Sequence, residues 1–109
     1  MTLQPDLNGK TILITGATAG IGLSAAQTLA GMGASILGVG RSEERCALAA
    51  AEIRQKYPSS RVHFFTADLA SQRQIRRLAE EIIAYVAAHH SGQLDVLANN
   101  AGVVSSWYT

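Results

Sequence analysis

Three glycines that follow a short apolar run limit what this chain can fold into. Residues Thr11–Thr15 are apolar or β-branched without interruption, which is typical of a strand buried on both faces of a sheet. Gly16, Gly20 and Gly22 come next, and a helical pattern runs from Ile21 to Met32. A helix that begins at such a loop offers unpaired N–H groups and its positive dipole end to an anion. The pattern therefore predicts a phosphate site, although three close glycines alone could also form an ordinary turn.

Each glycine of this loop has a separate expected role. Gly16 allows the tight turn, Gly20 lets the backbone approach a pyrophosphate, and Gly22 lets the helix pack closely on the strand. Ile21 stands between the last two and opens the helix. The spacing is G-x-x-x-G-x-G rather than the G-x-G-x-x-G of the common dinucleotide fingerprint.

The rest of the chain alternates short apolar runs with helical segments. Strands joined by helices form parallel sheets with right-handed crossovers. We therefore predict an α/β fold, a Rossmann-type doubly wound parallel sheet. The remaining strands are expected at 35–40, 61–66 and 94–98, and the remaining helices at 43–56 and 72–90, capped by Ser42 and Ser71.

The end of the second expected strand bears on the choice of cofactor. In dinucleotide-binding folds, an acidic residue about 20 positions after the glycine loop binds the ribose 2′-hydroxyl of NAD. Here Gly40 and Arg41 occupy that place, and no carboxylate occurs between Gly22 and Glu43. A guanidinium forms bidentate, charge-assisted hydrogen bonds with a phosphate. Arg41 therefore favours NADP over NAD, and the alternative is a solvated arginine at the start of a helix.

The composition argues against several functional classes. Nine basic and eight acidic residues are scattered along the chain, which speaks against binding to nucleic acid. No apolar stretch reaches the ~18 residues of a membrane span, and we see no signal peptide, so a cytoplasmic location is the default. The single cysteine, Cys46, cannot form an internal disulfide and is interpreted as a packed thiol. His89 and His90 have no third ligand nearby, so we expect no metal site.

Four features in this order resemble the short-chain dehydrogenase/reductase family. The resemblance extends from Gly9 to Gly102, and its lettering is closest to retinol-dehydrogenase-like and protochlorophyllide-reductase-like members. It implies an oxidoreductase that transfers a hydride to or from a nicotinamide dinucleotide. The features are Thr15-Gly16-x-x-x-Gly20-Ile21-Gly22, Gly40-Arg41, Asp68-Leu69 and Asn99-Asn100-Ala101-Gly102.

The resemblance also implies roles for single residues in binding the cofactor. Asp68 would accept a hydrogen bond from the adenine amino group, and the backbone of Leu69 would contact the adenine ring. Asn99 would fasten its loop to the neighbouring segments, and the backbone of Asn99–Ala101 would line the adenosine ribose. Thr18 would place its hydroxyl near the phosphates. Without the family context, Asp68 could simply mark the end of a strand.

The family's catalytic residues are not found in the sequence. The resemblance implies a serine and a Tyr-x-x-x-Lys pair after the fourth strand, but neither Lys10 nor Lys56, the only lysines, follows a tyrosine by four residues. We therefore expect residues 1–109 to form an incomplete NAD(P)-binding domain, with strand order 3-2-1-4 by resemblance and truncated after the fourth strand. The strand at 94–98 would then be a bare apolar edge that promotes self-association.

Three functions remain open at this point. The first is the NADP(H)-binding portion of an oxidoreductase that acts on an alcohol or carbonyl substrate. The second is a non-catalytic nucleotide-binding module, and the third is a non-functional gene fragment. The residues that would choose the substrate belong, by resemblance, to the missing half.

Overall fold

The computed structural model describes residues 6–89 and 93–98, and in them strands and helices alternate along the chain. The strands are all parallel and lie in the order β3-β2-β1-β4, which confirms the predicted doubly wound sheet. The elements are β1 (Thr11–Thr15), α1 (Gly20–Gly31), β2 (Ser35–Gly40), α2 (Glu43–Lys56), β3 (Val62–Thr66), α3 (Gln72–His89) and β4 (Val96–Ala98).

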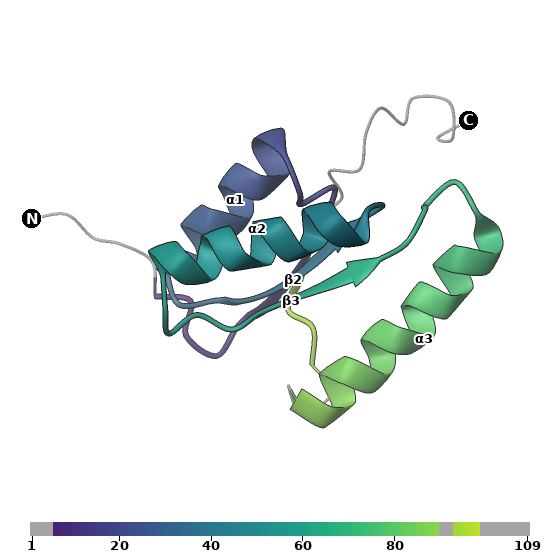
Figure 1. Cartoon of the computed structure of the whole chain (residues 1–109). Coiled ribbons are helices and arrows are strands. Elements are labelled where there is room, and N and C mark those ends of the chain that lie inside the picture. The colour runs from purple at the N-terminus through teal and green to yellow at the C-terminus, as the bar shows by residue number, and fades with distance from the viewer. Residues whose placement is uncertain (1–5, 90–92, 99–109) are drawn as a thin grey trace, which may run out of the picture.

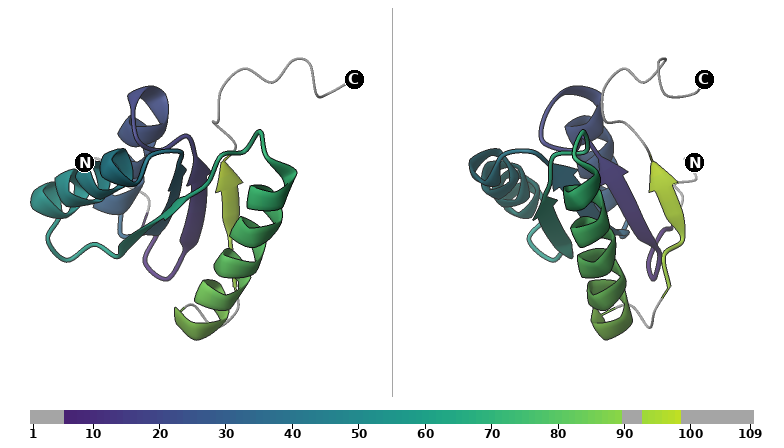
Figure 2. Two further views of the ribbon diagram at one scale, coloured as in Figure 1. Left: turned by 45° about the vertical axis from the view of Figure 1, so that its right-hand side comes forward. Right: turned by 90° about the vertical axis from the view of Figure 1, so that its right-hand side faces the viewer.

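Helices cover both faces of the sheet (Figures 1 and 2). α1 and α2 lie side by side on one face, and α3 lies alone on the other. Alternate residues of β1 and β2 enter the two cores, as the period of a strand requires. The core under α1 and α2 contains Ile12, Ile14, Ile36 and Ile53, and the core under α3 contains Leu13, Leu37, Val39, Phe65 and Leu78.

The helix boundaries follow the local sequence signals. Gly33, with φ of 100°, takes the left-handed conformation just after α1. Ser42 caps α2, and its Oγ accepts a hydrogen bond from the Arg45 N–H at 3.2 Å. α2 ends at Lys56, before the Tyr57-Pro58 pair that a helix cannot continue through. Within the described residues, no helix combines the length and apolar character needed to cross a bilayer.

The amino ends of β1 and β4 are joined by a side chain. The Thr11 N–H donates to Oδ2 of Asp95 at 2.8 Å, and the Asp95 N–H donates back to the Thr11 carbonyl at 2.9 Å. Gln93 holds the other carboxylate oxygen at 3.1 Å. Because the Asp95 carboxylate occupies this position, the regular β4 begins at Val96 rather than at Leu94, where we expected it.

Aromatic rings fill the space between β3 and the end of α3. The His63 ring stacks on Tyr85 at 4.3 Å between centroids, and His89 stacks on Tyr85 at 4.1 Å. Phe65 meets the rings of His63 and Tyr85 edge to face. Burial lowers the pKa of His63, and the nearby positive charges of His89 and Arg54 lower it further, against a smaller opposite effect of Glu81.

This lowered pKa predicts a loss of stability in mild acid. The unfolded chain takes up the His63 proton near pH 6.5, above the folded-state pKa. The free energy of unfolding should therefore fall as the pH drops through 6.5, and this contribution should level off below the folded-state pKa. Urea midpoints measured along a pH series check it. A His63→Asn variant with the same pH dependence as the wild type would contradict it.

Candidate functional site

The loops at the carboxyl ends of the strands are joined to one another by backbone hydrogen bonds. The Ala17 N–H donates to the Val39 carbonyl at 3.2 Å, and the Ala67 N–H donates to the Gly40 carbonyl at 2.9 Å. These bonds tie the glycine loop after β1 to the end of β2, and the end of β2 to the loop after β3. The segments that carry the glycines, Arg41 and Asp68 therefore meet at one edge of the sheet, which is where open α/β sheets bind ligands.

Two residues of the glycine loop adopt a left-handed backbone conformation. Gly16 and Gly20 have φ of 64° and 58°, in the left-handed region that residues with a β-carbon avoid. A β-carbon on Gly20 would meet no atom within 4 Å, so the space in front of it is open. Gly22 is buried, on the same face of α1 as Ala26 and Ala30.

The start of α1 is not capped by a side chain of its own. Its N-cap residue, Ala19, makes no side-chain hydrogen bond, and no acidic residue occurs in the first turn. The first helical hydrogen bond runs from the Leu23 N–H to the Ala19 carbonyl at 3.3 Å. The preceding N–H groups, those of Gly20–Gly22, have no acceptor within the helix. They leave the positive helix end available to an anion.

Ile21 and Thr18 differ in their surroundings. The Ile21 side chain is 79% exposed beside the open space at Gly20. Thr18 is half-buried, and its methyl group lies over the backbone of Gly40 at the end of β2. The family resemblance implies a role for the Thr18 hydroxyl only. The contact with Gly40 joins two separate loops, so no local sequence pattern indicates it.

Arg41 follows Gly40 directly and is exposed. Within the described residues, its guanidinium makes no side-chain hydrogen bond or ion pair. The neighbouring α2 differs from α1, since Ser42 already satisfies its start. An anion at this point would therefore be held by the Arg41 side chain rather than by the end of α2.

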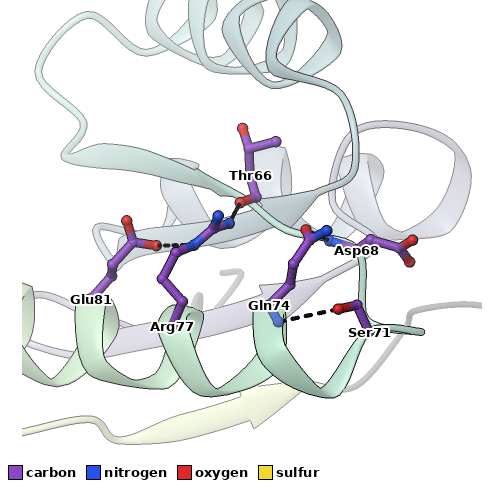
Figure 3. A network of polar contacts seen from close by, with 6 residues as sticks. All are labelled: Thr66, Asp68, Ser71, Gln74, Arg77 and Glu81. Carbon is purple, nitrogen blue, oxygen red and sulfur yellow. Dashed lines mark hydrogen bonds and ion pairs between the residues drawn. The ribbon is translucent and has the colours of Figure 1, made fainter.

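Asp68 lies in a network that ties the loop after β3 to α3 (Figure 3). Its Oδ1 accepts a hydrogen bond from the Ala70 N–H at 2.9 Å, and its own N–H donates to Oε1 of Gln74 at 2.7 Å. Gln74 in turn donates its N–H to Ser71 Oγ at 3.3 Å. The Asp68 carboxylate points away from the Gln74 side chain. Asp68 therefore shapes the turn, and its Oδ2 has no protein hydrogen bond in the described part of the chain.

The network only partly follows the sequence motif at the start of α3. The Ser71-x-x-Gln74 spacing is the signature of a capping box, in which the Gln74 side chain would accept the N–H of Ser71. Its actual partner, the N–H of Asp68, lies one turn earlier than that motif implies. Leu69 packs against the core under α3. Asn99 and Ala101 lie outside the described residues.

A cavity of about 830 Å³ opens at the opposite edge of the sheet. Thr11, Lys56, Arg61 and Asp95 are among its lining residues. The carboxyl ends of the helices point toward this edge, and their partial negative charge disfavours an anion there. Lys56 stands in the last turn of α2, where a cation offsets the helix dipole. The helix dipoles therefore favour a phosphate-bearing ligand at the carboxyl edge rather than in this cavity.

Known proteins are similar to this chain in sequence and in fold. The model of the short chain dehydrogenase family matches residues 10–108. Human retinol dehydrogenase 13 is 40% identical over 101 residues, which cover 93% of this chain and 29% of that protein. This match confirms the expected likeness to retinol dehydrogenases. The chain therefore spans less than a third of the length of this relative.

Two solved structures extend the comparison. A citronellol catabolism dehydrogenase of Pseudomonas aeruginosa superposes with a TM-score of 0.79 at 30% identity, covering 98% of this chain and 43% of that one. A metagenomic short-chain oxidoreductase solved in complex with NADP has a TM-score of 0.76 at 33% identity, covering 90% and 41%. Because the family match and these likenesses extend over nearly all of its residues, the chain belongs to the short-chain dehydrogenase family.

Proposed function

We propose that the carboxyl edge of the sheet binds NADP(H), with the pyrophosphate held at Gly16–Gly22. The observation that carries this proposal is the loop before α1. It has two left-handed glycines, open space at Gly20 and an uncapped helix start. The N–H groups of Gly20, Ile21 and Gly22 would donate to the phosphate oxygens, and the helix dipole would favour their charge. Gly22 allows this close approach because it lets α1 pack against the sheet.

The preference for NADP over NAD rests on the end of β2. Arg41 is exposed and unpaired among the described residues, and no carboxylate occurs between β2 and Glu43 to bind a free 2′-hydroxyl. A guanidinium would form bidentate bonds with the 2′-phosphate. The solved relative in complex with NADP, at 33% identity, supports this choice. Asp68, through its remaining oxygen, and the backbone of Leu69 would contact the adenine, while Asn99 and Ala101 would line the ribose.

In this proposal the chain supplies the cofactor half of an oxidoreductase that acts on an alcohol or carbonyl. Hydride transfer also needs a proton relay and a held substrate. Arg61 and His89 follow Tyr57 and Tyr85 by four residues, so neither of these tyrosines belongs to a Tyr-x-x-x-Lys pair.

Binding and turnover measured on the same preparation test this proposal. The purified chain should bind NADPH in a calorimetric titration, more tightly than NADH. The NADPH absorbance should stay constant after aldehydes, ketones or retinoids are added. A chain that binds neither cofactor would contradict the proposed site. Oxidation of NADPH in proportion to an added carbonyl would show instead that residues here described as structural carry the chemistry.

We also propose that the chain self-associates through β4. In the described sheet β4 lies at the edge, and its Val96 and Leu97 are 49% and 61% exposed. Uncharged apolar edges pair with other chains, whereas a charge on the edge prevents it. Light scattering should show oligomers for the wild type and smaller species for Leu97→Lys. A wild-type chain that is monomeric at all concentrations tested would refute this proposal.

A further inference from the structure

Gly40 lies at a point where three segments of the proposed cofactor site touch. A β-carbon on Gly40 would overlap the methyl Cγ2 of Thr18 and lie 2.9 Å from Sγ of Cys46. Thr18 belongs to the glycine loop, and Cys46 belongs to the first turns of α2. Gly40 has no positive φ, so glycine is required here for space and not for backbone conformation.

The contact is enclosed on the side of Cys46 and β3. Cys46 is 4% exposed, and its Sγ lies 3.6 Å from the Phe65 carbonyl oxygen in β3. The residue before Thr18 is fixed to β2 by the Ala17 N–H bond to the Val39 carbonyl. Closely packed interiors transmit a displacement rather than absorb it. We therefore expect a β-carbon at Gly40 to displace Thr18 and with it the glycine loop, or else the end of β2 or α2.

We propose that Gly40 is a positioning residue that sets the glycine loop relative to Arg41, with Cys46 packed against Gly40 from α2. This inference rests on the proposed function. Arg41 is the next residue after Gly40, so the contact joins the pyrophosphate loop and the 2′-phosphate arginine into one unit. Such preorganisation lowers the cost of ordering both groups around a ligand.

The proposal predicts an effect distinct from the loss of Arg41. NADPH and NADH share the pyrophosphate, and only NADPH has the 2′-phosphate. Gly40→Ala should therefore weaken both cofactors, by about tenfold, because overpacking displaces the loop that both use. Removal of the Arg41 guanidinium should affect NADPH alone.

A rescue experiment identifies the atoms responsible. Thr18→Ser removes Cγ2, the atom that the new β-carbon would overlap, and retains the hydroxyl. The double variant with Gly40→Ala should recover most of the affinity, measured against Thr18→Ser alone in a double-mutant cycle. Adding Cys46→Ala should remove the remaining close contact.

Gly38 provides a matched control on the same strand. A β-carbon on Gly38 would overlap the ring of Phe64, which supplies its three nearest atoms. Gly38→Ala should lower stability, and Thr18→Ser should not restore it. Equal rescue of the variants at Gly38 and Gly40 would show that Thr18→Ser acts generally, and would overturn the proposal.

A second readout does not depend on cofactor binding. Cys46 is the only cysteine, so its rate of alkylation by iodoacetamide reports the opening of this contact. Gly40→Ala should speed labelling, and Thr18→Ser in the same chain should slow it again. If the wild type binds neither cofactor, the proposed function fails. The labelling rates still measure the coupling among Gly40, Thr18 and Cys46.

The binding and folding results together test the positioning role of Gly40. Weakened binding of both cofactors and rescue by Thr18→Ser support the positioning role. Wild-type affinity in folded Gly40→Ala, or no rescue, overturns it. If Gly40→Ala does not fold, recovery of the fold in the double or triple variant supports the contact, and failure of both to fold contradicts it.

Discussion

Gly20→Val is expected to reduce the affinity for NADPH and NADH by a hundredfold or more, on the order of 2.7 kcal/mol. The branched side chain would occupy the open space in front of Gly20, where the pyrophosphate is proposed to lie. The substitution should also lower the free energy of unfolding by about 1–2 kcal/mol, because the φ of 58° places the residue in the left-handed region. Affinity is therefore measured at a temperature where circular dichroism shows the variant folded.

Gly9 allows the effect of strain to be separated from that of lost space. Its φ is 84°, a β-carbon on it would also meet no atom within 4 Å, and it lines the cavity at the opposite edge. Gly9→Val should therefore lower stability by a similar amount and leave cofactor affinity at the wild-type value. Wild-type affinity in folded Gly20→Val would remove the glycine loop from the site.

Arg41→Ala is expected to weaken NADPH by ten- to hundredfold and to leave NADH nearly unchanged. Hydrogen bonds to charged groups contribute about 1.5–3 kcal/mol, and only NADPH offers Arg41 a phosphate. The difference should shrink as the salt concentration rises, because Arg41 is exposed. Calorimetric titration with both cofactors measures it.

Arg61 is the matched control for this substitution. It is exposed like Arg41 but lines the cavity at the opposite edge of the sheet. Arg61→Ala should change neither affinity. A wild-type chain with equal affinity for NADPH and NADH would contradict the assignment of Arg41 to the 2′-phosphate.

The order of elements was predictable because its signals are local. The β-branched run at Thr11–Thr15, the caps at Ser42 and Ser71, and Gly33 after α1 each act on neighbouring residues, and the structure has the corresponding elements. The residues of the glycine loop could be named for the same reason, since the loop and the helix start are contiguous.

The contacts that escaped prediction join residues distant in the sequence. The Asp95 carboxylate accepts a hydrogen bond from the Thr11 N–H, 84 residues earlier in the chain. No sequence pattern around either residue indicates the other. The packing of Thr18 on Gly40 depends on how two loops meet after the sheet has formed. The sequence marks Gly40 only as part of a family motif, whereas in the structure a β-carbon there would overlap Thr18.

The central claim, that the carboxyl edge of the sheet holds the dinucleotide, is tested most directly by amide chemical shifts of the ¹⁵N-labelled chain during an NADPH titration. The two edges are lined by different residues, so the pattern of shifts locates the ligand. We predict saturable changes concentrated at residues 16–22, 40–42 and 68–69. Changes concentrated at residues 56–61, around the cavity at the opposite edge, or no changes at saturating NADPH, would contradict the claim.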